Sequence, residues 1–148
     1  MNTYATNSQA DEYFESRYDS ALWDGTSEVE KEKLLVTASR YLTNLNWAGD
    51  KADEDQVLEF PRGDDTDIPD DIIHATCEIA YALLDGRNIE YERETLGQSS
   101  VAAVGARLAS DPNSVDVARL HGIPSIVAWN LLRPYLRDGS AITLVRMD

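Results

Sequence analysis

The sequence has a single cysteine, Cys77, among its 148 residues. One cysteine cannot form a disulfide within the chain, so we expect a protein that works in a reducing compartment. Lysine is scarce as well, because none follows Lys51 and every later basic residue is arginine. No apolar run reaches the roughly 20 residues that a membrane-spanning helix needs. These absences argue against a disulfide-stapled secreted domain, and we expect no membrane contact.

The chain also lacks the motifs that usually mark an enzyme. Neither glycine-rich phosphate-binding pattern, GxGxxG or GxxxxGK[ST], occurs in it. Of the two histidines, only His74 has possible metal ligands close by, since Asp70, Cys77 and Glu78 lie within four positions of it. No second cluster supplies the remaining ligands. We therefore expect no metal, no cofactor and no catalytic residues, and we predict that the protein is not an enzyme.

What the chain has in excess is negative charge, with 27 acidic against 13 basic residues. Residues 45–72 alone hold ten carboxylates and two basic residues. No register of this stretch has both the ligand spacing and the glycine of an EF-hand loop, so we do not expect calcium there. The simplest interpretation is a solvated acidic loop over residues 48–68.

The charge is divided unevenly along the chain. Residues 1–74 contain 18 acidic and six basic residues, a net charge of −12, whereas residues 75–148 have a net charge of −2. An acidic front and an arginine-bearing back suit head-to-tail contacts between copies, because arginine binds a carboxylate through two parallel hydrogen bonds. Such contacts close into rings when the rotation allows. A soluble monomer with uneven surface charge explains the same pattern equally well.

Apolar periodicity and capping residues predict four helices, over residues 8–18, 27–47, 69–85 and 124–137. Ser8 and Ser27 open the first two with N-terminal capping signatures. Gly49 is expected to end the second helix, and Pro134 to kink or end the fourth.

Two other segments have a different character. Residues 88–110 contain alternating and β-branched stretches that predict an extended arm or β-hairpin, and residues 140–148 form a strand-like tail. The predicted fold class is therefore mainly α. We expect a single domain over residues 1–148, a bundle of about four helices with this arm and tail.

A set of landmarks occurs in order along the chain. It comprises Trp47-Ala48-Gly49, Gln56, Phe60-Pro61-Arg62 and Ile68-Pro69, between an early "ADEYFESRY" helix and a closing "IPSIVAWNLLRPYL". With this organisation, residues 10–138 resemble the small head-to-tail connector (adaptor) proteins of tailed bacteriophages. Sequences of this kind are often labelled DnaT-like single-stranded-DNA-binding proteins.

The resemblance implies a structural virion protein. Its subunits would form a ring, typically a dodecamer, beneath the portal, extending the DNA channel and docking tail or nozzle proteins. The expected partners are copies of the chain itself, the portal protein and a tail-completion protein, while packaged double-stranded DNA passes through without specific binding. The expected location is the head-to-tail interface of the virion, with the host cytoplasm during assembly.

Three groups of residues receive roles under this resemblance. Trp47, Phe60 and Pro61 would pin the acidic loop to the bundle, and Arg62 would pair with a neighbouring carboxylate. The candidate contacts to a neighbouring subunit or the portal are Arg107, Arg119, Arg133, Arg137 and Arg146. An acidic face toward a lumen or partner, repelling DNA by like charge, would comprise Asp50, Asp53, Glu54, Asp55, Asp64, Asp65 and Asp67. The unusual acidity of residues 50–71 departs from the family pattern.

The alternative is a replication protein that binds single-stranded DNA. A net charge of −14 opposes it, because affinity for nucleic acid comes mostly from cations that neutralise phosphates. A patch of Arg133, Arg137 and Arg146 is its one footing in the sequence. The aromatic residues at helical spacing are expected in the core rather than stacked on bases.

Overall fold

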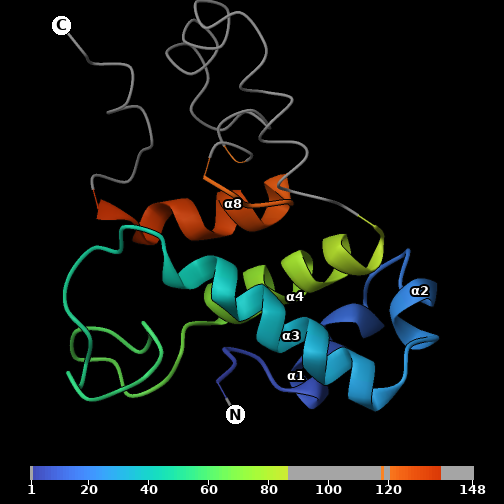
Figure 1. Ribbon diagram of the computed structural model, residues 1–148, viewed down its shortest axis with the longest axis horizontal. Coiled ribbons are helices and arrows are strands. Elements are labelled where there is room, and N and C mark those ends of the chain that lie inside the picture. The colour runs from blue at the N-terminus through green and yellow to red at the C-terminus, as the bar shows by residue number, and fades with distance from the viewer. Residues whose placement is uncertain (1, 87–117, 119–120, 138–148) are drawn as a thin grey trace, which may run out of the picture.

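The computed structural model describes residues 2–86, 118 and 121–137, which form a bundle of helices (Figure 1). Within these residues there are five α-helices and no strand. The elements are α1 (Asn7–Glu15), α2 (Ala21–Asp24), α3 (Glu28–Thr43), α4 (Asp70–Leu84), α8 (Ile126–Leu132) and the 3-10 helix η1 (Arg133–Tyr135). The predicted mainly α bundle is confirmed. The predicted arm at residues 88–110 and the tail at 140–148 lie outside the described residues.

Helix α4 is the centre of the bundle. It contacts α1, α2, α3 and α8, and Figure 1 shows α8 on one side of it and α1 on the other. A helix covered on several sides needs apolar residues around most of its circumference, and the sequence "DDIIHATCEIAYALL" supplies them after its two aspartates. The polar exception Thr76 is buried, and its hydroxyl donates to the Ile72 carbonyl at 2.8 Å. None of the described helices is both long enough and apolar enough to span a membrane.

The first helix begins earlier than predicted. Thr6, not Ser8, is the N-cap of α1, and its side chain accepts a hydrogen bond from the Gln9 amide while the Gln9 side chain accepts one from the Thr6 amide. This reciprocal pair is a capping box. Helix α1 ends at Glu15 rather than at residue 18, and the short α2 forms where no helix was predicted.

The predicted ends of the later helices also differ from the observed ends. Ser27 caps α3 as predicted, but α3 ends at Thr43 and not near residue 47, so Gly49 does not end it. Helix α4 begins and ends within one residue of the prediction. Helix α8 is shorter than residues 124–137, because the backbone tightens into η1 around Pro134, which has no amide hydrogen to donate.

The capping box gives a first test of the fold. Replacing Thr6 with alanine is expected to lower the free energy of unfolding by about 1 kcal/mol, because the Gln9 amide loses its acceptor. Urea denaturation followed by circular dichroism measures the change. Ser8→Ala is the matched control, since Ser8 lies exposed inside α1 and makes no capping bond; a larger effect at Ser8 would show that the helix begins where the sequence pattern put it.

Candidate nucleic-acid interface

The residues assigned as loop anchors lie where the acidic loop meets the bundle. Trp47 and Phe60 are each only 3% exposed, and their rings pack edge to face with centroids 4.8 Å apart. The Trp47 indole N–H donates to the Leu42 carbonyl at 2.8 Å. Phe60 also packs edge to face on Tyr135 at 6.0 Å, so the loop contacts η1 as well as the end of α3. Pro61, joined to Phe60 by a cis peptide, is half-buried.

Arg62 joins the middle of this loop to its start. Its guanidinium donates to the carbonyls of Ala48 and Gly49 at 2.9 and 2.5 Å, and it pairs with the Glu59 carboxylate at 3.3 Å. Lys51 lies 3.5 Å from the same carboxylate. The neighbouring carboxylate expected for Arg62 is thus Glu59. The loop contains no helix or strand, and these side-chain bonds give it a defined shape.

The seven residues assigned to the acidic face are all exposed, and none of them forms an ion pair with another described residue. The assigned arginines are less uniform. Arg137 donates to the Trp47 carbonyl at 3.3 Å, and its backbone amide donates to the Asn46 carbonyl at 2.8 Å. It therefore joins η1 to the start of the loop. Arg133 is half-buried and has interactions of its own. Arg107, Arg119 and Arg146 lie outside the described residues.

The histidine and cysteine weighed as metal ligands face different surroundings. The His74 ring stacks on Tyr13 with centroids 4.6 Å apart, at the bundle surface. Cys77 is completely buried in α4, and this burial raises the pKa of its thiol to about 12. Among the residues that the structure describes, no group of three or more His, Cys, Asp or Glu side chains is arranged to hold a metal ion.

The buried thiol leads to a second prediction. In the folded protein Cys77 should react with a disulfide exchange reagent far more slowly than in urea, because the thiolate is the reactive form and burial disfavours it. The raised pKa also means that the folded state keeps a proton that the unfolded chain loses near pH 9, so stability should fall as the pH rises from about 9 toward 12. Absorbance of the released thiol product gives the rate; fast reaction without denaturant would contradict this burial.

Two cations stand out because their side chains have no partner among the described residues. Of the basic residues that the structure describes, only Lys33 and Arg40 have side chains that make no hydrogen bond or ion pair. Both are exposed on α3, and a separation of seven residues places them on one face, two turns apart. No acidic residue occurs between Lys33 and Gly49. This acid-free run is visible in the sequence, but the net charges of residues 1–74 and 75–148 do not reveal it.

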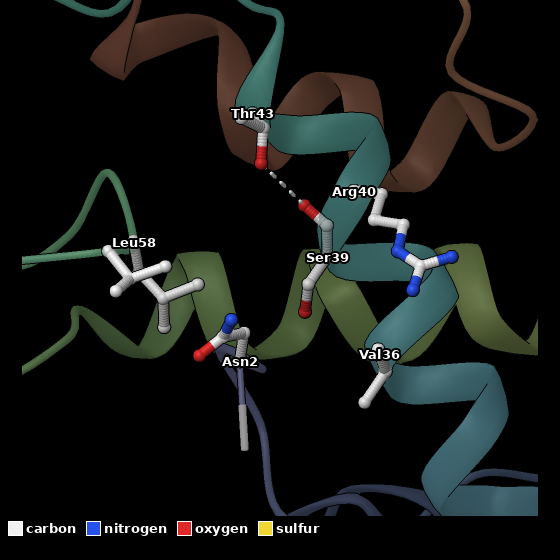
Figure 2. Close-up of a pocket in the computed structure, with 7 residues that line it drawn as sticks. Asn2, Val36, Ser39, Arg40, Thr43 and Leu58 are labelled. Carbon is white, nitrogen blue, oxygen red and sulfur yellow. Dashed lines mark hydrogen bonds between the residues drawn. The ribbon is translucent and has the colours of Figure 1, made fainter.

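Arg40 lines a groove of about 360 Å³. In Figure 2, Asn2 and Leu58 lie on one side of Ser39, and the Arg40 side chain projects on the other. The groove forms between α3, the N-terminal segment and the acidic loop, which are far apart in the sequence. Its lining comprises Asn2, Val36, Ser39, Arg40, Thr43, Val57 and Leu58.

The polar groups of this groove fall into two classes. Ser39 and Thr43 are already engaged, since the Ser39 hydroxyl donates to the Leu35 carbonyl at 2.9 Å and the Thr43 hydroxyl donates to the Ser39 carbonyl at 3.4 Å. The Asn2 amide and the Arg40 guanidinium make no side-chain hydrogen bond within the described chain. The groove therefore offers one cation and one free amide for binding, beside apolar walls.

A family model described as "Putative DnaT-like ssDNA binding protein" matches residues 1–147. No curated protein matches the chain, and no solved structure does. The interpretation as a bacteriophage virion protein, a portal-binding head-to-tail connector in a dodecameric ring, is wrong, because the matched family is described by single-stranded DNA and not by a place in a virion. Because the match covers nearly the whole sequence, the chain belongs to this family of DnaT-like proteins.

Proposed function

We propose that the protein binds single-stranded DNA through the face of α3 that carries Lys33 and Arg40. The family description supports this function, and the two cations, whose side chains make no hydrogen bond or ion pair with a described residue, support this location. Binding through phosphates needs cations that are exposed and not already neutralised by carboxylates. Lys33 and Arg40 meet both conditions.

The net charge of −14 limits the strength of such binding without preventing it. Repulsion between exposed charges is largely screened beyond the Debye length of about 8 Å at physiological ionic strength, so the charges near the bound strand matter most. Lys33 and Arg40 lie about 10 Å apart along the helix axis at a rise of 1.5 Å per residue. No acidic residue occurs between Lys33 and Gly49, and this spacing allows contacts to two separate phosphates. Affinity should be modest and should depend on salt.

The salt dependence gives a direct test. For two phosphate contacts to a single strand, the logarithm of the binding constant should fall against the logarithm of salt concentration with a slope of about −1.4. Arg40→Gln should halve this slope, because one contact is lost, and the same holds for Lys33→Gln. Fluorescence anisotropy of a labelled thymidine oligonucleotide, titrated at several salt concentrations, measures both.

Arg137→Gln is the matched control for this experiment. It also removes one exposed positive charge, but from a residue just beyond η1 and not from the α3 face. Binding of this variant should stay close to that of the unaltered protein. If Arg137→Gln weakens binding and Arg40→Gln does not, the arginine patch is the DNA interface and the α3 face is not.

A further inference from the structure

The groove beside Arg40 combines features that suit a nucleotide base. Its volume of about 360 Å³ falls at the lower end of the range for sites that bind small molecules, roughly 300–1,000 Å³. Val36 of α3 and two loop residues, Val57 and Leu58, supply apolar walls. Val57 is 70% exposed, so its apolar surface is available to a ligand. Apolar surface of this kind is stabilised when a flat ring covers it.

The free polar groups of the groove match the rest of a nucleotide. A side-chain amide offers both a donor and an acceptor, the combination that base edges present, and Asn2 has this amide unused at the groove. Arg40 supplies the cation for a phosphate, and its side chain lies on the other side of Ser39 from Asn2 and Leu58 (Figure 2). The base would then lie inside and the phosphate outside.

We propose that this groove takes the base of one unstacked nucleotide, with the adjoining phosphate on Arg40. The inference rests on the proposed function, and it adds that the protein recognises the base of a single nucleotide. A base can enter a groove only when it is free of its pairing partner, so the site would select single strands over duplexes.

Competition binding separates base recognition from phosphate binding. A labelled thymidine oligonucleotide bound to the full chain would be displaced by three unlabelled competitors of equal length: the same oligonucleotide, a sugar-phosphate strand without bases, and a duplex. The base-free strand and the duplex should compete about ten-fold more weakly, since one stacked base contributes about 1–3 kcal/mol.

The matched variants are Val57→Ser and Val29→Ser. Both positions carry exposed valines, 70% and 62% exposed, so neither change should disturb folding, and circular dichroism verifies this. Val57→Ser removes an apolar wall of the groove and should reduce the preference for the base-containing strand several-fold; Val29→Ser, which lies away from the groove lining, should not.

The results of these experiments also distinguish recognition of a base in the groove from binding of single-stranded DNA as such. If both strands compete equally while Arg40→Gln still weakens binding, DNA is held by its phosphates alone, so the base site is wrong and the proposed function stands. If Val29→Ser and Val57→Ser have equal effects, the groove is not the base site. If no oligonucleotide binds at low salt, both proposals are wrong.

Discussion

Replacing Trp47 with alanine should lower the free energy of unfolding by about 3–5 kcal/mol, the usual range for removing a buried tryptophan. Its ring is nearly inaccessible and packs against Phe60, and its indole N–H is bonded to the Leu42 carbonyl. The change would leave a cavity at the junction of α3, η1 and the acidic loop. Urea unfolding followed by far-ultraviolet circular dichroism measures the loss without relying on tryptophan fluorescence.

Trp47→Phe distinguishes the packing of the ring from its hydrogen bond. Phenylalanine keeps much of the buried surface but cannot donate to the Leu42 carbonyl, so a smaller loss of about 1–3 kcal/mol is expected. Because Val57 and Leu58 reach the groove from the anchored loop, Trp47→Ala should also weaken binding of DNA under conditions where the variant is still folded. A loss of stability below about 1 kcal/mol for Trp47→Ala would show that the loop is not held by this residue.

Replacing Arg17 with methionine should lower the free energy of unfolding by about 3–5 kcal/mol, because it leaves a buried carboxylate without its cation. The Glu78 side chain is only 7% exposed in α4, and Arg17 pairs with it at 2.7 Å while lying 4.4 Å above the Tyr81 ring. The Tyr13 hydroxyl donates to the other Glu78 oxygen. Thermal and urea unfolding would measure the loss.

A double-mutant cycle identifies the cause. Combined with Glu78→Gln, the Arg17→Met change should cost much less than it does alone, since no uncompensated charge remains buried and glutamine can still accept from Tyr13. Equal costs in both backgrounds would mean that Arg17 contributes by packing on Tyr81 and not by its charge.

Burial and the bond to Glu78 raise the pKa of Tyr13 well above its usual value. The unfolded chain ionises its tyrosines near pH 10, so stability should fall as the pH rises above that value.

The helices could be predicted where local pattern and tertiary packing agree. Helix α4 has an apolar residue at nearly every position that faces a neighbour, and its ends match the sequence signals closely. Helix α3 shows that apolar periodicity does not always predict where a helix ends. Its apolar pattern continues through Leu45 to Trp47, yet the helix ends at Thr43, because Trp47 instead pairs with Leu136 in a backbone bridge. Periodicity along one segment contains no information about such a distant partner.

The candidate site could not be predicted from the sequence for a related reason. Which cations are free depends on which are paired, and the pairs join distant positions: Arg17 and Glu78 are 61 residues apart, and Lys31 and Asp11 are 20 apart. From sequence alone, Lys33 looks no different from Lys31, which is buried beside two carboxylates. The groove next to Arg40 is assembled from three separate segments. The residue types were visible in the sequence, but their juxtaposition was not.

The bridge between Trp47 and Leu136 determines when the acidic loop can fold during synthesis of the protein. Arg137 and Trp47 are 90 positions apart, and the strand-like contacts between η1 and the start of the acidic loop close a long stretch of chain. Contacts between distant positions form late in folding, because the entropy of the intervening chain must first be lost. During translation, α3 and α4 leave the ribosome well before η1 does. The acidic loop therefore makes these contacts only after residues 135–137 have left the ribosome.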